Sequence, residues 1–282
     1  MTGSRRSSAG PRERSCRTAA APVITLLTDF GQRDGFVGIV KGVLLRHCPT
    51  ARLVDLSHEV PPQDVMGGAL ILASAVEYFP PGTVHLAVVD PGVGTDRRPL
   101  LIETGKSILV GPDNGLLSLA AECSPVRHVI HLDRPEHFLS AASQTFHARD
   151  VFAPVAARVA AGIAVSRLGT KVRDFERLTL PKPRRIDDGL DGQVIHVDRF
   201  GNLISNIRAE DLTDFRQDEL LISIRGVEIR GVVANYSAVR EGRPLALWNS
   251  WGRLEIAVRN DSAARHLRAR SGDRVEIRKS RR

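Results

Sequence analysis

The stretch Val23-Ile-Thr-Leu-Leu-Thr-Asp-Phe-Gly31 decides how this 282-residue chain is to be interpreted. Its first six residues are mostly apolar or β-branched, as in a short buried strand, and an acidic residue and a glycine follow them in a turn. Residues 36–47 then place apolar side chains at helical spacing, and Pro49 lies just beyond. A buried strand that leads into a helix is the repeating unit of an α/β sheet, so we expect further units downstream.

The alternation of strands and helices continues to about residue 161. We expect strands at 51–56, 83–89 and 126–132, a hairpin at 99–110 that turns at Gly105-Lys106, and helices at 65–78, 114–121 and 151–161. This pattern predicts an α/β N-terminal domain with a mostly parallel sheet that is covered by helices.

The pattern changes at Leu180-Pro-Lys-Pro-Arg-Arg185, which is typical of a linker. Strands dominate after it, at 193–197, 203–207, 220–224, 245–248, 254–258 and 275–278, so we expect a small all-β, barrel-like C-terminal domain. The predicted organisation is a disordered basic leader (1–22), the α/β domain (23–180), a linker (181–191), the β-barrel domain (192–278) and a basic tail (279–282).

The net charge of +8 comes from the two ends of the chain. Five arginines and one glutamate among residues 1–22 give +4, four basic residues among the last five give another +4, and residues 23–277 sum to zero. Nucleic-acid readers usually carry their charge on a folded face, so we expect no nucleic-acid partner. The leader has no apolar core of a secretory signal, although an Arg/Ser-rich transit peptide or a misassigned start codon would also explain it.

The composition also excludes several classes of protein. No apolar run approaches the roughly 18 residues of a membrane span, so we expect no membrane partner. The three cysteines cannot form a disulfide framework, which fits a reducing, cytoplasmic location. No cysteine pair has zinc-site spacing, and Asp55-x-x-His58 lacks a third ligand, so no metal site is expected.

Asp29 and Asp90 each follow an expected strand, and ligands of α/β sheets bind beyond the carboxyl ends of the strands. Asp29 and Asp34 would bind sugar hydroxyls or an ammonium group; alternatively Asp34 caps the helix and Asp29 closes an Asx-turn. Asp90 would be a carboxylate kept ionised by Arg97 or Arg98, or else part of a simple turn.

Three further clusters have both a functional and a structural interpretation. His147, in a loop before a helix, could titrate, or it is a surface residue beside an Asp150 that caps the helix. In Asp198-Arg-Phe-Gly-Asn202, Phe200 could stack on a flat ring and Asn202 could pair with an amide-like edge, or the segment is a Gly-Asn turn. Gly111-Pro-Asp-Asn-Gly115 is well explained as a tight turn.

Taken together and in order, these segments resemble the S-adenosyl-L-methionine (SAM) hydroxide adenosyltransferase family, the adenosine-forming SAM hydrolases related to fluorinase and chlorinase. The resemblance runs from about Val23 to Ile277. It rests on Thr28-Asp-Phe-Gly31, Val89-Asp-Pro-Gly-Val-Gly-Thr95, Gly111-Pro-Asp-Asn-Gly115, Phe146-His-Ala-Arg-Asp150, Asp198-Arg-Phe-Gly-Asn202 and Asn249-Ser-Trp-Gly-Arg-Leu-Glu-Ile-Ala257.

The resemblance implies hydrolysis of SAM to adenosine and L-methionine by a water molecule that attacks the ribose C5′, with SAM as the substrate and no cofactor. It also implies a homotrimer whose active sites lie between the N-terminal domain of one subunit and the C-terminal domain of the next. The water-activating set maps onto Asp90, Arg97 and His147. Binding roles map as follows: Asp29 holds the ribose hydroxyls, Asp34 and Asp198 the methionine ammonium, Phe200 and Asn202 the adenine, and Ser250 the methionine carboxylate.

Two residues depart from the family pattern: Ala148 replaces the usual glycine, and Trp251 stands where a smaller or charged residue is usual. Because Trp251 follows Ser250, Arg253 is an alternative to Ser250 as the contact for the methionine carboxylate. Halogenating relatives have a tyrosine at the position of Asp90, and fluorinase has a threonine at that of Val93. The absence of both hydroxyls favours a hydrolase over a SAM-dependent halogenase. A non-catalytic SAM or adenosine sensor is the other alternative.

Overall fold

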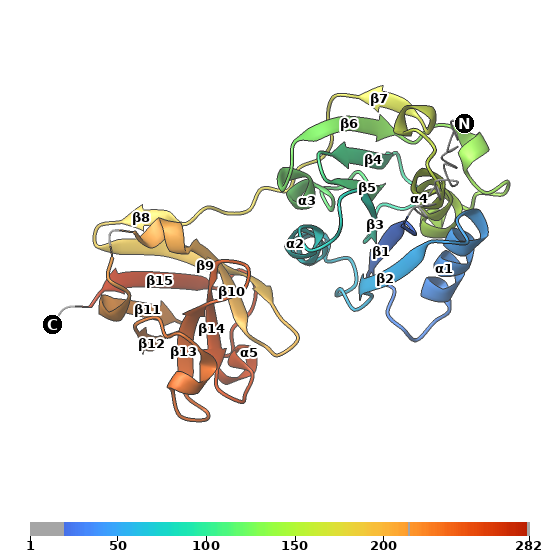
Figure 1. Cartoon of the computed structure of the whole chain (residues 1–282). Helices are drawn as coiled ribbons and strands as arrows, with labels where there is room; N and C mark the ends of the chain where they lie inside the picture. The colour runs from blue at the N-terminus through green and yellow to red at the C-terminus, as the bar shows by residue number, and fades with distance from the viewer. Residues whose placement is uncertain (1–19, 214, 281–282) are drawn as a thin grey trace, which may run out of the picture.

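The computed structural model describes residues 20–213 and 215–280, which form two domains with one sheet each (Figure 1). Most of the expected leader (1–22) and the end of the expected tail (279–282) lie outside the described residues. Of the helices within the described ranges, none combines the length and apolar character needed to cross a membrane.

The N-terminal sheet has seven strands in the order β2-β1-β3-β5-β4-β6-β7. They are β1 (Val23–Thr28), β2 (Arg52–Ser57), β3 (Thr83–Val88), β4 (Pro99–Thr104), β5 (Ser107–Pro112), β6 (Val126–His131) and β7 (Thr170–Val172). The helices are α1 (Phe36–His47), α2 (Val65–Val76), α3 (Ser118–Glu122) and α4 (Ala153–Ala160). A π-helical turn, Ala148–Phe152, leads into α4.

The sheet is mixed, so the prediction of a mostly parallel sheet was wrong. Among the described strands, parallel pairing is limited to β2 with β1, β1 with β3, and β3 with β5. The expected hairpin at Gly105-Lys106 does form and makes β4 antiparallel to β5, and β6 and β7 add further antiparallel pairs. A hairpin reverses the chain after a few residues, whereas two parallel strands need a longer crossover connection. The strand pairs from β5 to β7 are therefore antiparallel, beginning at this hairpin.

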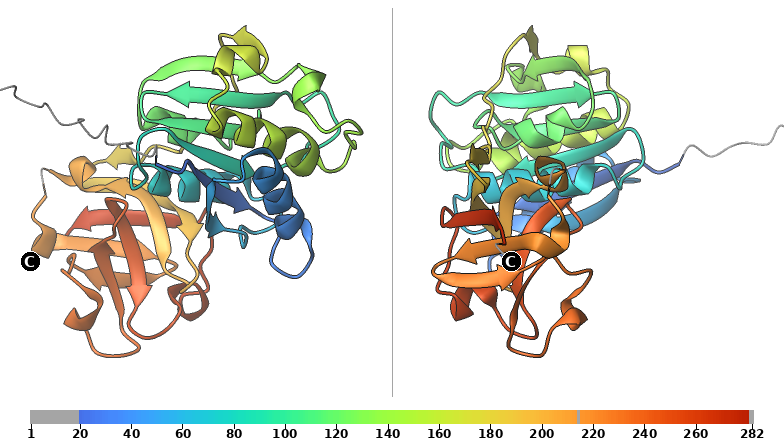
Figure 2. Two further views of the ribbon diagram at one scale, coloured as in Figure 1. Left: turned by 45° about the vertical axis from the view of Figure 1, so that its right-hand side comes forward. Right: turned by 90° about the vertical axis from the view of Figure 1, so that its left-hand side faces the viewer.

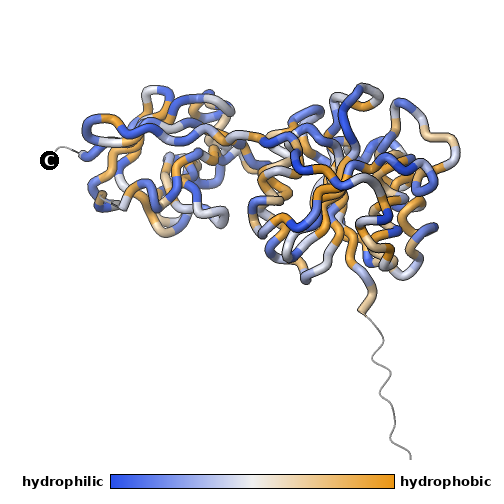
Figure 3. The backbone as a smooth tube through the Cα atoms, turned by 90° about the horizontal axis from the view of Figure 1, so that it is seen from above, coloured by the Kyte–Doolittle hydropathy of each residue, from blue (hydrophilic) through white to orange (hydrophobic). Residues whose placement is uncertain are grey.

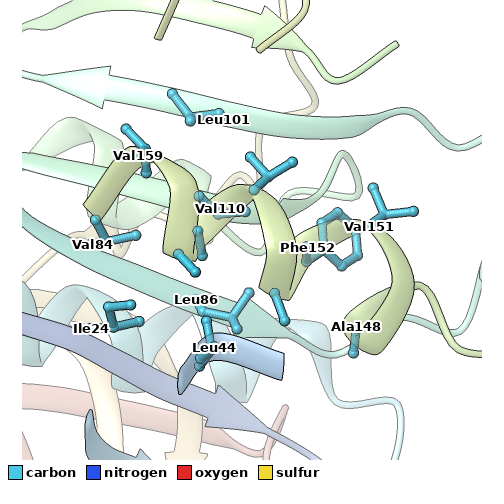
Figure 4. Packing of buried hydrophobic residues seen from close by; sticks show 14 of the residues in the cluster. Ile24, Leu44, Val84, Leu86, Leu101, Val110, Ala148, Val151, Phe152 and Val159 are labelled. Carbon is cyan, nitrogen blue, oxygen red and sulfur yellow. The ribbon is translucent and has the colours of Figure 1, made fainter. Parts of the chain in front are cut away.

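Side chains that alternate along the central strands divide the core into two clusters. On one face Ile24, Val84 and Leu101 pack with α1, α4 and the π-helical turn, as Figure 4 shows around Phe152. On the other face Leu27 and Ala87 belong to a cluster with α2 and α3. In the hydropathy view the hydrophobic segments gather in the middle of each domain (Figure 3).

The C-terminal sheet is antiparallel throughout and nearly closed, as expected for a barrel-like domain. Its strands are β8 (Arg184–Ile186), β9 (Gly189–Val197), β10 (Leu203–Arg208), β11 (Leu220–Ile224), β12 (Val227–Arg230), β13 (Pro244–Trp248), β14 (Arg253–Val258) and β15 (Arg274–Lys279), with the short helix α5 (Ala263–His266). The end strands β12 and β13 approach each other where Val233 N donates to Ala246 O at 2.8 Å.

The two domains meet on the α2–α3 side of the first sheet (Figures 1 and 2). Ile195 and Trp251 of the C-terminal domain join the apolar cluster beneath α2 and α3. The Trp251 ring also lies 5.6 Å from that of His196. Trp251, which departs from the family pattern, therefore serves as a packing contact between the domains.

Candidate active site

Asp29 and Asp90 come together because their strands are parallel neighbours. Thr28, the last residue of β1, pairs with Val88, the last residue of β3. Asp29 follows β1 directly, and Asp90 follows β3 two residues after Val88. The expected placement of two carboxylates at the carboxyl edge of the sheet is observed.

A cavity of about 380 Å³ opens at this edge. Asp29, Asp90 and His147 all line it. The remaining lining residues are Phe30, Phe36, Pro62, Gln63, Val88, Pro91, Val93, Thr145, Phe146 and Ala148. The cavity therefore collects three of the predicted site residues, and all of its lining comes from the N-terminal domain as far as the chain is described.

Asp90 is paired with Arg97 from the same loop. Nε of Arg97 donates to Oδ1 of Asp90 at 3.1 Å, and Nη2 donates to Oδ2. The side chains of Arg97 and Asp90 are only 7% and 6% exposed. The guanidinium also lies over the ring of Phe152, 5.4 Å from its centroid. A buried, bidentate ion pair of this kind holds a carboxylate in one orientation.

His147 is the third member of this group. Its Nδ1 lies 3.3 Å from Nη2 of Arg97. The ring is half-buried, and burial, followed by the positive charge of Arg97, lowers the pKa of His147, although Asp90 and Asp150 oppose this shift. A histidine with a lowered pKa is neutral at pH 7 and can accept a proton.

The loop that carries His147 is anchored from behind by Asp150. Oδ2 of Asp150 accepts from the Ser143 backbone at 2.8 Å, and Arg149 donates to both carboxylate oxygens. Asp150 lies inside the π-helical turn and closes the loop, so the alternative that it caps a helix was wrong. The alternative that His147 is a surface residue was also wrong.

Asp29 is held by the β2–α2 connection: its Oδ2 accepts from Gln63 N at 2.9 Å. The turn after β1 is closed by the Thr28 hydroxyl, which accepts from Phe30 N at 3.3 Å, in place of the expected Asx-turn. Asp34 is exposed and does not line the cavity. The expected helix cap at Asp34 was wrong, because α1 begins after Gly35 without a side-chain cap.

Three predicted binding residues lie together in the β9–β10 turn of the C-terminal domain. Oδ1 of Asp198 accepts from the backbone of Phe200 and Asn202, and Oδ2 accepts from Asn202 Nδ2 at 2.9 Å. Gly201 has φ +86°, a conformation that favours glycine. The turn interpretation is therefore correct, and it leaves the Phe200 ring 78% exposed.

Ser250 lies in the β13–β14 turn, which is closed by the side chain of Asn249. Ser250 is exposed and lines a second cavity, of about 530 Å³, together with Trp251 and Arg253 between the two domains. Arg253 is buried and donates to the backbone oxygen of Asn206 at 3.3 Å. Within the described residues, Asp34, Asp198, Phe200, Asn202 and Ser250 are all absent from the lining of the first cavity.

Sequence reasoning missed two features near these residues. The Tyr236 hydroxyl donates to Oε1 of Glu255 at 2.7 Å, and burial together with nearby carboxylates raises the pKa of both groups. Phe30, Phe36 and Phe146 form an edge-to-face cluster in the cavity wall, with centroids 5.3–6.0 Å apart. Aromatic residues are scarce in this chain, and three phenylalanines in segments next to predicted site residues were the available signal for this cluster.

No group of three or more His, Cys, Asp or Glu side chains suited to a metal ion occurs within residues 20–213 and 215–280.

Family models match both domains: the SAM hydroxide adenosyltransferase N-terminal domain matches residues 24–169, and the C-terminal domain of the same family matches residues 192–276. The chain belongs to the SAM hydroxide adenosyltransferase family. The resemblance inferred from its motifs is confirmed.

Relatives in this family extend over nearly the whole chain. An (R)-S-adenosyl-L-methionine hydrolase from Salinispora tropica is 41% identical, with 92% of this chain and 98% of the relative covered. A fluorinase from Actinoplanes is 28% identical, with 84% and 90% covered. A crystal structure of an uncharacterized conserved protein from Thermotoga maritima superimposes with a TM-score of 0.83 at 36% identity, with 90% and 99% covered.

Proposed function

We propose that this protein hydrolyses SAM to adenosine and L-methionine, with the R configuration at the sulfonium sulfur. The observation that carries the proposal is that Asp90 and His147 line one cavity and are both contacted by Arg97, in a chain that is 41% identical to a named (R)-S-adenosyl-L-methionine hydrolase. In that name the L gives the configuration at the α-carbon of methionine, so the R gives the configuration at the sulfonium sulfur.

The chemistry of the leaving group explains why this set of residues suffices. Attack at C5′ breaks a bond to a positively charged sulfur, and the departing methionine thioether is neutral, so no general acid is needed. Bulk water has a pKa of about 15.7, and the difficulty lies in its deprotonation. We infer that no cofactor takes part and that SAM is the only small molecule required besides water.

We assign proton acceptance to His147 and positioning of the attacking water to Asp90. General base assistance contributes about 10²–10⁴-fold, and holding reactants in an attack geometry contributes about 7–11 kcal/mol. Arg97 holds the Asp90 carboxylate in one orientation through two hydrogen bonds, so that Asp90 can accept a hydrogen bond from the attacking water. Asp90 and Val93 carry no hydroxyl of the kind found in the halogenating relatives, which favours water over a halide as the nucleophile.

We propose that a second copy of the chain completes the binding site. Asp29 binds the ribose hydroxyls from within the cavity. Asp198, Phe200 and Asn202, on a turn with an exposed aromatic ring, bind the ammonium and adenine of SAM held by the neighbouring subunit, with Asp34 and Ser250 at the methionine end. The proposed assembly is a cytoplasmic homotrimer with a site at each subunit junction.

The first experiment incubates the purified protein with each sulfonium epimer of SAM in ¹⁸O-labelled water and follows the products by mass spectrometry. Equal amounts of adenosine and methionine, with the label on adenosine and loss of turnover in His147→Ala, support the hydrolase. Retention of SAM or adenosine without turnover would identify a sensor. Formation of a 5′-halo-adenosine in chloride or fluoride would identify a halogenase.

The second experiment tests the shared site by co-expression of two defective variants. His147→Ala damages the proposed chemistry of the N-terminal domain, and Phe200→Ala removes the exposed ring of the C-terminal domain. If the site lies between subunits of a trimer, each site combines the N-terminal domain of one chain with the C-terminal domain of another. When the two variants assemble at random, both domains are intact in up to about one quarter of the sites, and activity returns. A mixture whose activity equals the mean of the two variants places the whole site in one chain.

A further inference from the structure

The turn that carries Asp29 is bonded on both sides to one buried residue, His58. Nδ1 of His58 lies 2.8 Å from the hydroxyl of Thr28, the residue before Asp29. The backbone oxygen of His58 accepts from Gly31 N, two residues after Asp29, at 2.7 Å. His58 and Thr28 are each only 2% exposed. A single residue of the β2–α2 connection therefore determines the path of the turn.

The other side of the His58 ring faces a carboxylate. Nε2 lies 3.1 Å from Oδ1 of Asp55, and Lys41 of α1 donates to Oδ2 of Asp55 at 2.6 Å. Burial alone would raise the pKa of Asp55, but the contacts with Lys41 and His58 lower it below its ordinary value. An ionised Asp55 favours the proton on Nε2, which leaves Nδ1 free to accept from the Thr28 hydroxyl.

The same connection also holds the carboxylate of Asp29. Gln63, five residues after His58, donates its backbone N–H to Oδ2 of Asp29 at 2.9 Å. Gln63 has φ +66°, which is uncommon for a residue with a side chain, and it lines the cavity beside Pro62. The segment from His58 to Gln63 is therefore a support that fixes both the backbone and the carboxylate of Asp29.

We propose that His58 is a positioning residue for recognition of the ribose: through Thr28 it fixes the Asp29 carboxylate at the angle at which both ribose hydroxyls can donate to it. This rests on the proposed function, in which Asp29 binds the ribose. His58 does not line the cavity and touches no reacting atom. Its effect is on substrate affinity, because a carboxylate held in one orientation loses less freedom when the ligand binds.

The chain supplies a matched control on the same strand. Thr25 of β1 is bonded at 2.8 Å to Nδ1 of His85, and both residues are fully buried. Thr25 lies three residues before Thr28, in the body of the strand and away from the cavity. Thr28→Val and Thr25→Val thus remove the same hydroxyl from the same kind of buried Thr–His pair, and only Thr28 adjoins Asp29.

The test measures binding of adenosine and of 2′,3′-dideoxyadenosine to the full-length protein by calorimetry. The dideoxy compound lacks both hydroxyls that would donate to Asp29, so we expect the wild type to prefer adenosine by at least roughly 10-fold. Thr28→Val should reduce this preference at least about threefold while affinity for the dideoxy compound stays unchanged. Thr25→Val should lower the melting temperature and leave the preference intact.

Substitutions at His58 separate positioning from a purely structural role. His58→Asn places an amide near the position of Nδ1, so it should keep the Thr28 contact and most of the ribose preference. His58→Gln places its amide near Nε2 and should lose the preference. With SAM as substrate, the loss should appear in KM, with kcat nearly unchanged.

Two results would overturn the proposal, and they are distinguishable. If Asp29→Ala abolishes the ribose preference but Thr28→Val and His58→Gln retain it, His58 has no positioning role and the proposed function is unaffected. If the wild type shows no preference between the two nucleosides, the assignment of Asp29 fails together with that of His58. The labelled-water experiment then decides separately whether the protein is a SAM hydrolase.

Discussion

The guanidinium of Arg97 contacts both carboxylate oxygens of Asp90, and the pair is almost fully buried at the edge of the cavity. The same guanidinium lies 3.3 Å from Nδ1 of His147. One cation thus lies beside both groups that we assign to the attacking water, and its removal should alter the two groups differently.

We expect Asp90→Asn to lower kcat by about 10²-fold or more with little change in KM, because an amide is a poorer acceptor for the water and no longer pairs with Arg97. Adenosine release, followed by chromatography, measures the effect. Asp113→Asn is the matched control: Asp113 is a buried carboxylate that accepts from the neighbouring Arg98 at 2.8 Å. It should lose stability and retain kcat, and full activity of Asp90→Asn would refute the assignment.

The acidic side of the pH–rate profile should report the protonation of His147. Because burial and Arg97 lower the pKa of His147, the neutral base persists below pH 6.5 and kcat/KM should fall only at lower pH. Arg97→Gln removes one of these causes and leaves Asp90 and Asp150, which raise the pKa. The acidic limb should therefore move to higher pH in that variant. A limb at the same pH in both proteins would show that it does not arise from His147.

Gly94 should tolerate no side chain. Its φ is +78°, and a Cβ atom there would lie 2.5 Å from the backbone oxygen of Gln144, in the loop that carries His147. Gly94→Ala should displace this loop and reduce kcat by at least about tenfold, since small misplacements of reacting groups are costly. Gly82→Ala, with φ +86° and open space around the site, is the control for backbone strain alone. Equal kcat values in the two variants would contradict the proposed effect on His147.

His85 should make the fold less stable in acid. It is fully buried, and burial lowers its pKa from 6.5 to about 4. The unfolded chain therefore binds a proton first as the pH falls, and stability is lost between pH 6.5 and about 4. The expected loss from pH 7 to pH 5 is about 2 kcal/mol. Denaturant unfolding of wild type and His85→Gln should show a smaller decrease in the variant, and equal decreases would exclude His85 as the cause.

Local patterns predicted the parts of this molecule that depend on neighbours in sequence. The strand at 23–28, the helix at 36–47 and the hairpin at 105–106 all appear where hydrophobic spacing and turn residues indicated them. Strand direction depends on which distant segments pair, so the mixed sheet could be inferred only by following the consequence of that hairpin.

The candidate site was predictable to the same extent. Asp29 and Asp90 were found because strand ends of parallel neighbours meet, and His147 because it lies in a loop before a helix. The support from His58 was not found, since the contact between the buried residues Thr28 and His58 joins positions 30 apart and leaves no spacing signature. Asp34 was predicted as a site residue together with Asp29, but it lies outside the cavity. Nothing in the sequence distinguishes an exposed loop carboxylate from one that lines a cavity.

The cavity of about 380 Å³ is lined within one domain, and the loop from Asp90 to Arg97 supplies both members of its buried ion pair. The turn with the exposed Phe200 belongs to a separate sheet. Under the proposed function, the loop that positions the attacking water and the turn that binds adenine therefore belong to different domains. Substitutions in the loop from Asp90 to Arg97 can then change the nucleophile without altering the contacts to adenine.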